Sequence, residues 1–431
     1  MRVLWFANTP GLSQHHLNNK ISGGGWISSL QSAVENSSGI ELGFVFYHDG
    51  VLTPFTGGKT HYYPVRKIGF SKKKRMLHRI TRKTEYQENL ADFLRIVKDF
   101  RPDIIHVHGT ENSFGLIVNH IQDIPIVISI QGNLTVYAHK YFAGMDMPGL
   151  IRQLRAGYPF FGADYSIWQK RARIEQEILQ KTKYVFGRTD WDRRISLVMA
   201  PEARYFHVDE VMREQFYHVK WEPLPSGVPV FLTTCSPSLY KGFETIIDTA
   251  KILVNNQFQF TWLVAGLREE DALVRLVKKS KGVNRLEDLN IRLTGLLSGE
   301  ELANRLVKAN VYVQVSHIEN SPNSLCEAML AGMPVIASFA GGTGSLVQDG
   351  VNGTLVQNGD PFVLAGGLME MIRNPEDSLR MAREGARTAH LKHDARTVVD
   401  QLLAGYSAII REHYGHQPGD LPLIHQLSVN G

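Results

Sequence analysis

Short apolar runs alternate with longer amphipathic stretches along most of this chain of 431 residues. The apolar runs have the length and composition of buried strands, and the stretches between them show helical spacing. Expected strands in the first half are Val3–Ala7, Gly43–Phe46, Ile104–Val107, Ile126–Ile130 and Tyr184–Gly187, and in the second half Phe231–Thr234, Thr261–Ala265, Ile291–Leu293, Val311–Val315 and Val335–Ala337. This alternation predicts an α/β protein with parallel, doubly wound sheets that have helices on both faces.

The same pattern divides the chain into two domains joined by a short linker. Expected helices cover 167–181, 241–255, 299–308, 322–331, 360–373, 376–389 and 394–413. Two prolines in the stretch 219–227 interrupt the alternation and indicate the linker. We therefore expect a first domain at 1–218, a second at 219–393, and a last helix at 394–413 that packs back on the first domain, followed by a tail at 414–431. The length is sufficient for two separate cores.

Composition places the chain among ordinary globular proteins. Hydrophobic residues make up 43% and charged residues 21% of the sequence. The two cysteines, Cys235 and Cys326, are far apart and offer no disulfide or zinc framework. Neither a signal peptide nor an apolar run long enough to cross a membrane is visible, so we expect a cytoplasmic protein.

The formal net charge of +5 is unevenly distributed. Between Gly50 and Thr84 there are ten Lys and Arg but no Asp or Glu. Met76, Leu77 and Ile80 share one side of this stretch, which favours a peripheral contact with anionic lipid on the inner face of the cell membrane. The alternatives are a solvated surface, and nucleic-acid binding, which the lack of interleaved aromatic residues disfavours. Candidate membrane-facing residues within 66–83 are Lys72, Lys73, Lys74, Arg75 and Arg79.

The stretch VYVQVSHIENSPNSLCEAMLAGMPVIASFAGG, residues 311–342, carries the most informative chemistry. Its pattern predicts a strand, a polar loop, a helix at 322–331 and a second strand. Ser321 has the residue type of a helix cap, and Pro322 suits the first helical position. The amino end of such a helix has unpaired N–H groups and partial positive charge, which favour a phosphate.

Two glutamates in this unit, Glu319 and Glu327, are separated by seven residues. Glu319 lies where the strand gives way to the loop, and Glu327 shares a helix face with Asn323 and Ser324. A ligand whose diphosphate contacts the helix end would thus place a sugar diol against each carboxylate. Alternatively, the two residues are an ordinary loop acid and a solvated helix residue.

The glutamate element and its flanking segments resemble the GT-B glycosyltransferases of the large retaining family 4. The resemblance rests on pieces that occur in the family's order: LYKGFETIIDTAKIL, WLVAG, RLTGLLSGEELANRL, the Glu-x7-Glu element with EAMLAGMPVIAS and a GG turn, and VQDGVNGTLV. It implies two Rossmann-like domains that face a central cleft. In that arrangement the second domain binds the nucleotide sugar and the first binds the acceptor.

The resemblance also assigns roles in the donor site. It places Glu319 beside the donor sugar, Glu327 on the ribose hydroxyls and Lys241 on the leaving diphosphate, where a fixed cation stabilises the growing negative charge. It implies that the diphosphate is bound by the backbone of Asn323, Ser324 and Leu325. Alternatively, Lys241 is a surface lysine beside a turn glycine. In the first domain the SGGGW segment matches the family's glycine loop, which lets the backbone approach the diphosphate through Gly23, Gly24 and Gly25.

The ends of the first-domain strands carry the remaining candidates. Strand alternation predicts that His106 packs in the core and that His108 faces the cleft as a catalytic residue. In GRTDWDRR, Arg188 and Asp190 are candidates for contacts with donor or acceptor, and a structural salt bridge is an equally good interpretation. Candidate acceptor-side residues are Glu111, Gln131 and Asn133.

The chain departs from many relatives at two positions. Ser236 stands where they have an arginine, so we expect Arg188 to supply the second cation for the diphosphate. Gln131 stands where they have a histidine, and its amide can bind a sugar hydroxyl but cannot act as acid or base.

The resemblance implies a retaining transferase, and we expect it to be independent of metal and to need no cofactor. We expect it to move a sugar from a nucleotide diphosphate sugar, UDP by family frequency, to a glycan or lipid-linked glycan in bacterial-type surface polysaccharide or glycoconjugate assembly. The alternatives are a non-catalytic nucleotide-sugar-binding or membrane-docked scaffold subunit, and a GT-B sugar epimerase. A dinucleotide oxidoreductase is disfavoured because the first strand continues into NTPGLSQ rather than into a GxGxxG turn.

Overall fold

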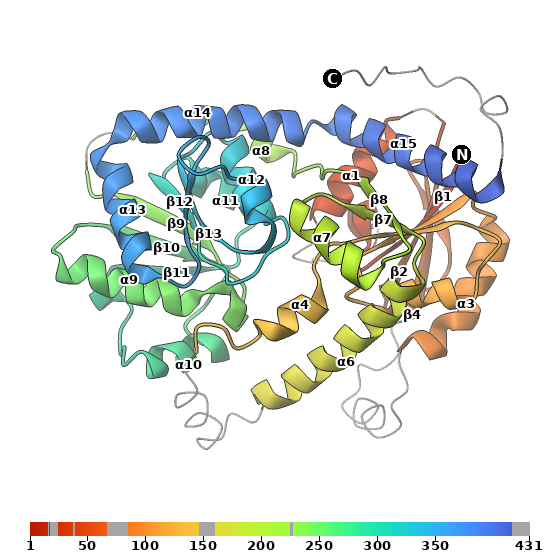
Figure 1. Ribbon diagram of the computed structural model, residues 1–431, viewed down its shortest axis with the longest axis horizontal. Coiled ribbons are helices and arrows are strands. Elements are labelled where there is room, and N and C mark those ends of the chain that lie inside the picture. Colours follow the sequence, from red (N-terminus) through yellow and green to blue (C-terminus); the bar gives the residue numbers. More distant parts are fainter. Residues whose placement is uncertain are drawn as a thin grey trace.

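The computed structural model describes residues 1–15, 17, 25–37, 39–66, 85–145, 160–224 and 227–415. They form two α/β domains side by side, with the long helices α14 and α15 running along one edge of both (Figure 1). This confirms the expected fold class of two domains built on parallel sheets.

The first sheet has eight strands in the order β3-β4-β2-β1-β5-β6-β7-β8. All neighbours pair in parallel except β3 and β4, which are antiparallel. The strands are β1 (Arg2–Ala7), β2 (Glu41–His48), β3 (Phe55–Gly57), β4 (Thr60–Arg66), β5 (Ile104–His108), β6 (Ile126–Ser129), β7 (Tyr184–Gly187) and β8 (Arg204–His207). The sequence pattern did not predict β3, β4 or β8, because β3 and β8 are short and half-buried edge strands and β4 contains a proline.

Alternate side chains of β1 reach two cores on opposite faces of this sheet. Trp5 packs with α1 and α15, whereas Phe6 packs with α3 and the 3-10 helix η2. Helices of this domain are η1 (Gly11–His15), α1 (Gly25–Glu35), α3 (Glu85–Phe100), η2 (Ser113–Asn119), α4 (Leu134–His139), α6 (Phe160–Lys181), α7 (Asp190–Met199) and, from the chain's end, α15 (Ala395–Tyr414). The Trp5 indole donates to the hydroxyl of Tyr406 at 2.9 Å, which ties α15 to the centre of the first sheet.

The second sheet has six strands, all parallel, in the order β11-β10-β9-β12-β13-β14. The strands are β9 (Val230–Thr234), β10 (Thr261–Ala265), β11 (Ile291–Gly295), β12 (Val311–Gln314), β13 (Val335–Phe339) and β14 (Thr354–Gln357). Helices around it are α8 (Gln215–His218), η3 (Leu239–Lys241), α9 (Phe243–Asn255), α10 (Ala272–Ser280), η4 (Glu287–Leu289), α11 (Gly299–Leu306), α12 (Asn323–Leu330), η5 (Gly341–Ser345), α13 (Pro361–Arg373) and α14 (Pro375–Lys392).

Local signals explain where several of these helices begin. Ser298 and Glu301 form a capping box at α11, and Thr189 and Asp192 form another at α7. Asp360 accepts from two amides at the start of α13, which then begins with Pro361.

The chain crosses between the domains twice, after β8 and at the junction of α14 and α15. Met212 and Phe216, which the sequence interpretation assigned to the first domain, are buried in the core of the second. The second domain therefore begins earlier than residue 219. Among the described residues no helix is both long and apolar enough to cross a bilayer.

Candidate active site

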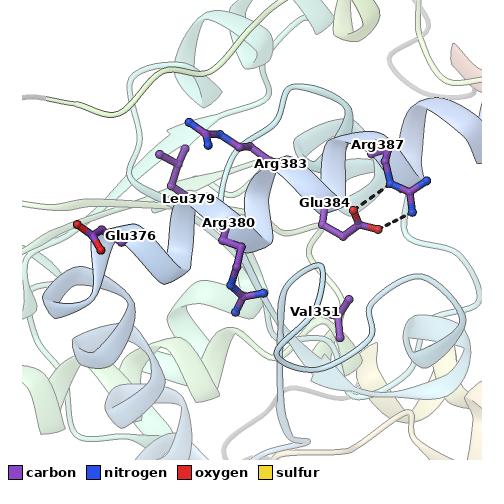
Figure 2. A pocket seen from close by; sticks show the side chains of 7 residues that line it. All are labelled: Val351, Glu376, Leu379, Arg380, Arg383, Glu384 and Arg387. Atoms are coloured by element: carbon purple, nitrogen blue, oxygen red, sulfur yellow. Dashed lines mark hydrogen bonds and ion pairs between the residues drawn. The ribbon is translucent and has the colours of Figure 1, made fainter.

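In the described part of the chain, polar groups gather in a surface hollow and at the boundary between the two domains. The hollow, about 600 Å³ in volume, lies along α14 (Figure 2). Its arginines largely pair with carboxylates of the same helix, as Arg387 does with Glu384 at 2.6 Å, and it contains none of the predicted site residues. The domain boundary brings several of the described candidates close together and is the better site.

The loop between β12 and α12 lies against the first domain, where Asn320 bonds to Thr189 and to the carbonyl of Ile130. Residues 311–322 are all buried, and only Asn323 and Ser324 at the start of α12 are partly exposed. The predicted cap is wrong, because Pro322 occupies the N-cap position and the Ser321 hydroxyl faces the thiol of Cys326 instead.

The start of α12 offers fewer backbone donors than expected. The amide of Leu325 donates to the carbonyl of Pro322 at 2.9 Å and is therefore not available to a ligand. The amides of Asn323 and Ser324 lie outside the helical ladder. The Ser324 hydroxyl faces the sheet, within 2.7 Å of the hydroxyls of Thr234 and Tyr312.

Lys241 and Glu319 form an ion pair beside the domain boundary. Lys241 Nζ donates to Glu319 Oε1 at 2.5 Å. Lys241 ends η3, two residues before α9, because Gly242 turns the chain with φ +77° and lies against the carbonyl of Val315. Burial lowers the pKa of Lys241, but the charge of Glu319 outweighs this and raises the pKa above its ordinary value. Lys241 is thus a fixed cation at neutral pH.

Glu327 is paired with an arginine that the sequence analysis missed. Arg213 Nε and Nη2 donate to the two carboxylate oxygens of Glu327, each at 2.7 Å. Glu327 is only 2% exposed and is not the solvated helix residue of the alternative interpretation. No motif marked Arg213, since it lies in the crossing segment 114 positions before its partner.

The first domain contributes Arg188 to the cleft, but in a buried ion pair. Arg188 Nη1 lies 2.7 Å from Glu210 Oε1, and Nη2 donates to the side-chain oxygen of Gln131 at 2.9 Å. The structure thus bears out the salt-bridge interpretation of Arg188. Asp190 is exposed and pairs with Arg193 at 3.3 Å, so its carboxylate makes no described contact with the cleft.

The histidines at the end of β5 are both buried. His106 bonds to Tyr406 and Ser129, as expected of a core residue. His108 does not face open space: it is 2% exposed and packs on Trp5 and on His106. Burial lowers the pKa of His108 to about 3, so the ring is neutral and unsuited to acid–base chemistry at neutral pH.

Of the acceptor-side candidates, Gln131 lies at the domain boundary, Glu111 lies beside Asn8 within the first domain, and Asn133 is structural. Glu111 follows the β5 turn, and burial raises its pKa to about 7. The Gln131 carbonyl accepts from Asn320 at 3.3 Å, which places it at the boundary between the domains. Asn133 is fully buried and caps α4 by accepting from Val136, so its assignment to the acceptor is wrong.

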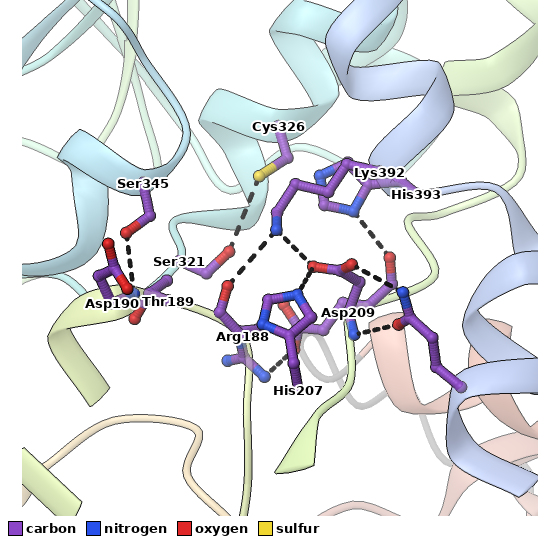
Figure 3. A network of polar contacts seen from close by, with 12 residues as sticks. Arg188, Thr189, Asp190, His207, Asp209, Ser321, Cys326, Ser345, Lys392 and His393 are labelled. Atoms are coloured by element: carbon purple, nitrogen blue, oxygen red, sulfur yellow. Dashed lines mark hydrogen bonds and ion pairs between the residues drawn. The ribbon is translucent and has the colours of Figure 1, made fainter. Parts of the chain in front are cut away.

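Direct hydrogen bonds hold the two domains together beside Glu319. Thr189 Oγ1 donates to Asn320 Oδ1 at 2.7 Å, and the Asp190 amide donates to Ser345 at 3.0 Å. Figure 3 shows the contact of Asp190 with Ser345 and a second network in which Asp209 accepts from Lys392 at the junction of α14 and α15. Polar contacts thus stabilise both segments in which the chain passes from one domain to the other.

Several candidates lie outside the described residues: Gly23 and Gly24, and the membrane-facing Lys72, Lys73, Lys74, Arg75 and Arg79. Gly25 begins α1, and a Cβ there would lie 2.7 Å from Cδ of Arg213. Over the described part of the chain, no three His, Cys, Asp or Glu side chains are grouped to hold a metal ion.

Comparison with known proteins agrees with this geometry. Residues 215–388 match the family model described as glycosyl transferases group 1. That segment contains Lys241, Glu319 and Glu327. The D-inositol 3-phosphate glycosyltransferase of Mycolicibacterium vanbaalenii is 32% identical over 157 residues, which cover 36% of this chain and 33% of that relative. The chain therefore spans about a third of the length of this relative.

Solved structures resemble nearly the whole chain at low identity. Sucrose-phosphate synthase from Thermosynechococcus elongatus superposes with a TM-score of 0.72 at 15% identity, covering 96% of this chain and 100% of that one. Anabaena Alr3699/HepE, solved in complex with UDP and glucose, superposes with a TM-score of 0.64 at 17% identity, covering 95% and 100%. The fold is GT-B.

Proposed function

We propose that this protein is a retaining glycosyltransferase that moves a sugar from a nucleotide diphosphate sugar to a glycan or lipid-linked glycan. The observation that carries the proposal is the Lys241–Glu319 pair in the cleft of a GT-B fold, at the base of the helix that bears Glu327. A fixed cation there stabilises the charge that develops on the leaving diphosphate.

The proposed binding mode divides the donor between three elements. The diphosphate contacts the Asn323 and Ser324 amides at the start of α12, and the ribose diol donates to Glu327. Glu319 holds Lys241 in place and lies beside the donor sugar. Arg188 approaches the donor only if it exchanges Glu210 for the diphosphate, so Lys241 is the principal cation.

Transfer with retention needs no protein base in this scheme. The acceptor hydroxyl oxygen bonds to the anomeric carbon on the face that the diphosphate leaves, while the bond from that carbon to the phosphate oxygen breaks. The leaving phosphate oxygen takes the acceptor's proton. The neutral His108 and the amide of Gln131 are compatible with such a scheme, because neither side chain has to transfer a proton. We further propose that no metal is required, since Lys241 and the helix end supply the positive charge.

We propose UDP as the nucleotide and a surface polysaccharide or glycoconjugate as the product. The structural likeness to Alr3699/HepE, which was solved with UDP and glucose, supports testing UDP-sugars before others. We also propose that residues 66–83 hold the protein at the inner face of the cell membrane, because their basic residues are attracted to anionic lipid.

A donor panel tests the proposal. Thermal stabilisation by UDP-, GDP-, ADP- and TDP-sugars identifies the donor, and slow donor hydrolysis, with and without EDTA, reports catalysis and its dependence on metal. We expect Glu319→Ala and Lys241→Ala to lower hydrolysis by roughly a hundredfold or more. Glu269→Ala and Lys278→Ala are matched controls, because these residues form a separate surface pair at 2.8 Å.

Three results would contradict the proposal. If no nucleotide sugar stabilises the protein against heat, the donor assignment is wrong. Stabilisation without hydrolysis or transfer indicates a non-catalytic binding subunit. Full activity in Glu319→Ala removes the site assignment.

A further inference from the structure

Two aromatic rings of the first domain lie against the 3-10 helix η3, which carries Lys241. They belong to Tyr137 on α4 and Trp168 on α6, and we call them the aromatic wall; α4 lies between the two domains (Figure 1). Tyr240 of η3 packs on both rings, with its ring centre 5.3 Å from that of Tyr137 and 6.1 Å from that of Trp168. Both distances are those of favourable aromatic pairs. The residue before Lys241 is thus part of the contact between the domains.

Buried hydrogen bonds hold the aromatic wall in a fixed shape. The Trp168 indole donates to the carbonyl of Leu134 at the start of α4, at 2.9 Å. Glu175 on α6 accepts from the amides of Leu134 and Thr135, at 3.0 and 2.7 Å. Glu175 is fully buried, so these bonds are shielded from water. The two helices therefore offer Tyr240 one well-defined surface.

Tyr240 also contacts both sides of the Lys241–Glu319 pair. Its ring centre lies 5.5 Å from Lys241 Nζ, within the range over which an aromatic face attracts a cation. Its carbonyl accepts from the amide of His317 at 2.7 Å, two residues before Glu319. The place of Tyr240 therefore affects both the ammonium group and the loop that carries its carboxylate partner.

Lys241 can reach a ligand from this position. Its side chain is 22% exposed, and Nζ has three N–H donors, of which Glu319 takes one. A lysine ammonium stands on a flexible four-carbon stem and takes many orientations unless its neighbours restrict it. The Tyr240 ring and the Glu319 carboxylate are two neighbours that do so.

We propose that Tyr240 is a positioning residue, through which the first domain holds Lys241 where the leaving diphosphate gains charge. The inference rests on the proposed function and goes beyond it. It makes the placement of a cation of the second domain depend on an aromatic contact with the first domain.

Amine labelling of the protein without any ligand tests the placement of Lys241. Acetic anhydride acetylates lysines, and mass spectrometry gives the rate at each one. Tyr240→Leu removes the ring but keeps an apolar side chain, and we expect it to raise the labelling rate of Lys241 about fivefold, because the ion pair then opens more often. Tyr240→Phe keeps the ring and should leave the rate unchanged. Lys278 is the internal control, since its side chain is 19% exposed and pairs with Glu269 at 2.8 Å in the same domain.

Steady-state hydrolysis of UDP-, GDP-, ADP- and TDP-glucose tests the effect on catalysis. We expect Tyr240→Leu to lower kcat about tenfold or more and to change KM less than about threefold, because charge on the leaving phosphate develops only in the transition state. Tyr240→Phe should retain the wild-type kcat. Trp168→Leu should lower kcat as Tyr240→Leu does, and the double variant should lower it no further, since both substitutions remove one contact. Tyr63→Leu is the matched control: Tyr63 is also half-buried and forms a T-shaped contact at 6.1 Å with Phe100, near the edge of the first sheet.

The outcomes separate this inference from the proposed function. A wild type that hydrolyses none of the four donors contradicts the proposed function, whatever the labelling shows. If the wild type hydrolyses a donor, an unchanged labelling rate of Lys241 in Tyr240→Leu overturns the positioning role alone. An equal rise at Lys241 and Lys278 also overturns it, because the ring would then only stabilise the domain. So do a rise in KM at unchanged kcat and additive losses in the double variant.

Discussion

At the scale of single residues, the cleft is organised by pairs of opposite charge. Lys241 with Glu319, Arg213 with Glu327 and Arg188 with Glu210 each place a buried or half-buried cation on a carboxylate. Removing one partner from such a pair leaves an uncompensated charge, which costs more than the pair contributes. Substitutions at these positions should therefore be compared with double variants that remove both charges.

Glu111 provides a pH-dependent prediction at this scale. Its pKa is raised to about 7 by burial, so the folded protein keeps the carboxyl protonated where the unfolded chain has already ionised. Its contribution to stability is present below the unfolded pKa of about 4.3 and is lost as pH rises toward 7. We expect the free energy of unfolding of Glu111→Gln, relative to that of the wild type, to rise by up to about 1.4 kcal/mol per pH unit across this window.

Unfolding by urea at pH 4.5, 5.5, 6.5 and 7.5 measures the effect. The control is Glu202→Gln, because Glu202 is exposed and its carboxylate stays in solvent. A stability difference between Glu111→Gln and the wild type that does not change with pH would show that the Glu111 carboxyl is not shifted.

At the scale of elements, a strand, a short turn and a helix place the charged groups. Gly242 is needed between η3 and α9, because its φ is +77° and a Cβ would lie 2.2 Å from the Val315 carbonyl oxygen. The sequence prediction of one helix from 241 to 255 missed this break. Because of this break, Lys241 lies in η3 rather than in α9, and its side chain contacts Glu319.

We expect Gly242→Ala to lower the free energy of unfolding by about 2–4 kcal/mol, since both the left-handed backbone and the clash are unfavourable. Gly282→Ala is the matched control: its φ is +64°, but no atom lies within 4 Å of the added Cβ. Gly282→Ala should lower the free energy of unfolding by only about 1 kcal/mol. Equal losses in the two variants, measured by urea unfolding, would show that contact with Val315 does not matter.

The elements themselves were predictable to different degrees. Strands buried on both faces, such as β1 and β12, were predicted because their apolar runs are continuous. The half-buried α10 and the edge strand β14 were not, since their partial exposure leaves mixed patterns that resemble loops. The cap of α12 was wrong because burial turned Ser321 toward Cys326 instead of the helix end.

At the scale of the whole molecule, the two domains are joined by contacts near each chain crossing. Thr189 reaches Asn320 on one side of the cleft, and Lys392 reaches Asp209 at the junction of the last two helices. Burial opposes ionisation of Asp209, but His207 and Lys392 outweigh it and lower its pKa. Asp209 of the crossing segment therefore belongs to one polar network with Lys392 and Arg188 (Figure 3).

Attachment to a membrane is a prediction for the intact molecule. Replacing Lys72, Lys73, Lys74 and Arg75 with glutamine should weaken co-sedimentation with phosphatidylserine vesicles by roughly a hundredfold or more, because each basic residue near an anionic surface contributes about 1 kcal/mol. Neutral phosphatidylcholine vesicles are the control. Unchanged binding would show that this stretch is only a solvated surface.

The sequence by itself determined the α/β alternation and a helix near residues 322–331, and it singled out Lys241, Glu319 and Glu327. These follow from neighbours close along the chain, where periodicity and turn residues act directly. The tertiary structure alone decided which groups meet: Arg213 with Glu327, Thr189 with Asn320, and His106 with Tyr406 are separated by 114, 131 and 300 positions. Contacts over such separations depend on how sheets and crossings pack, and they leave no pattern in the local sequence.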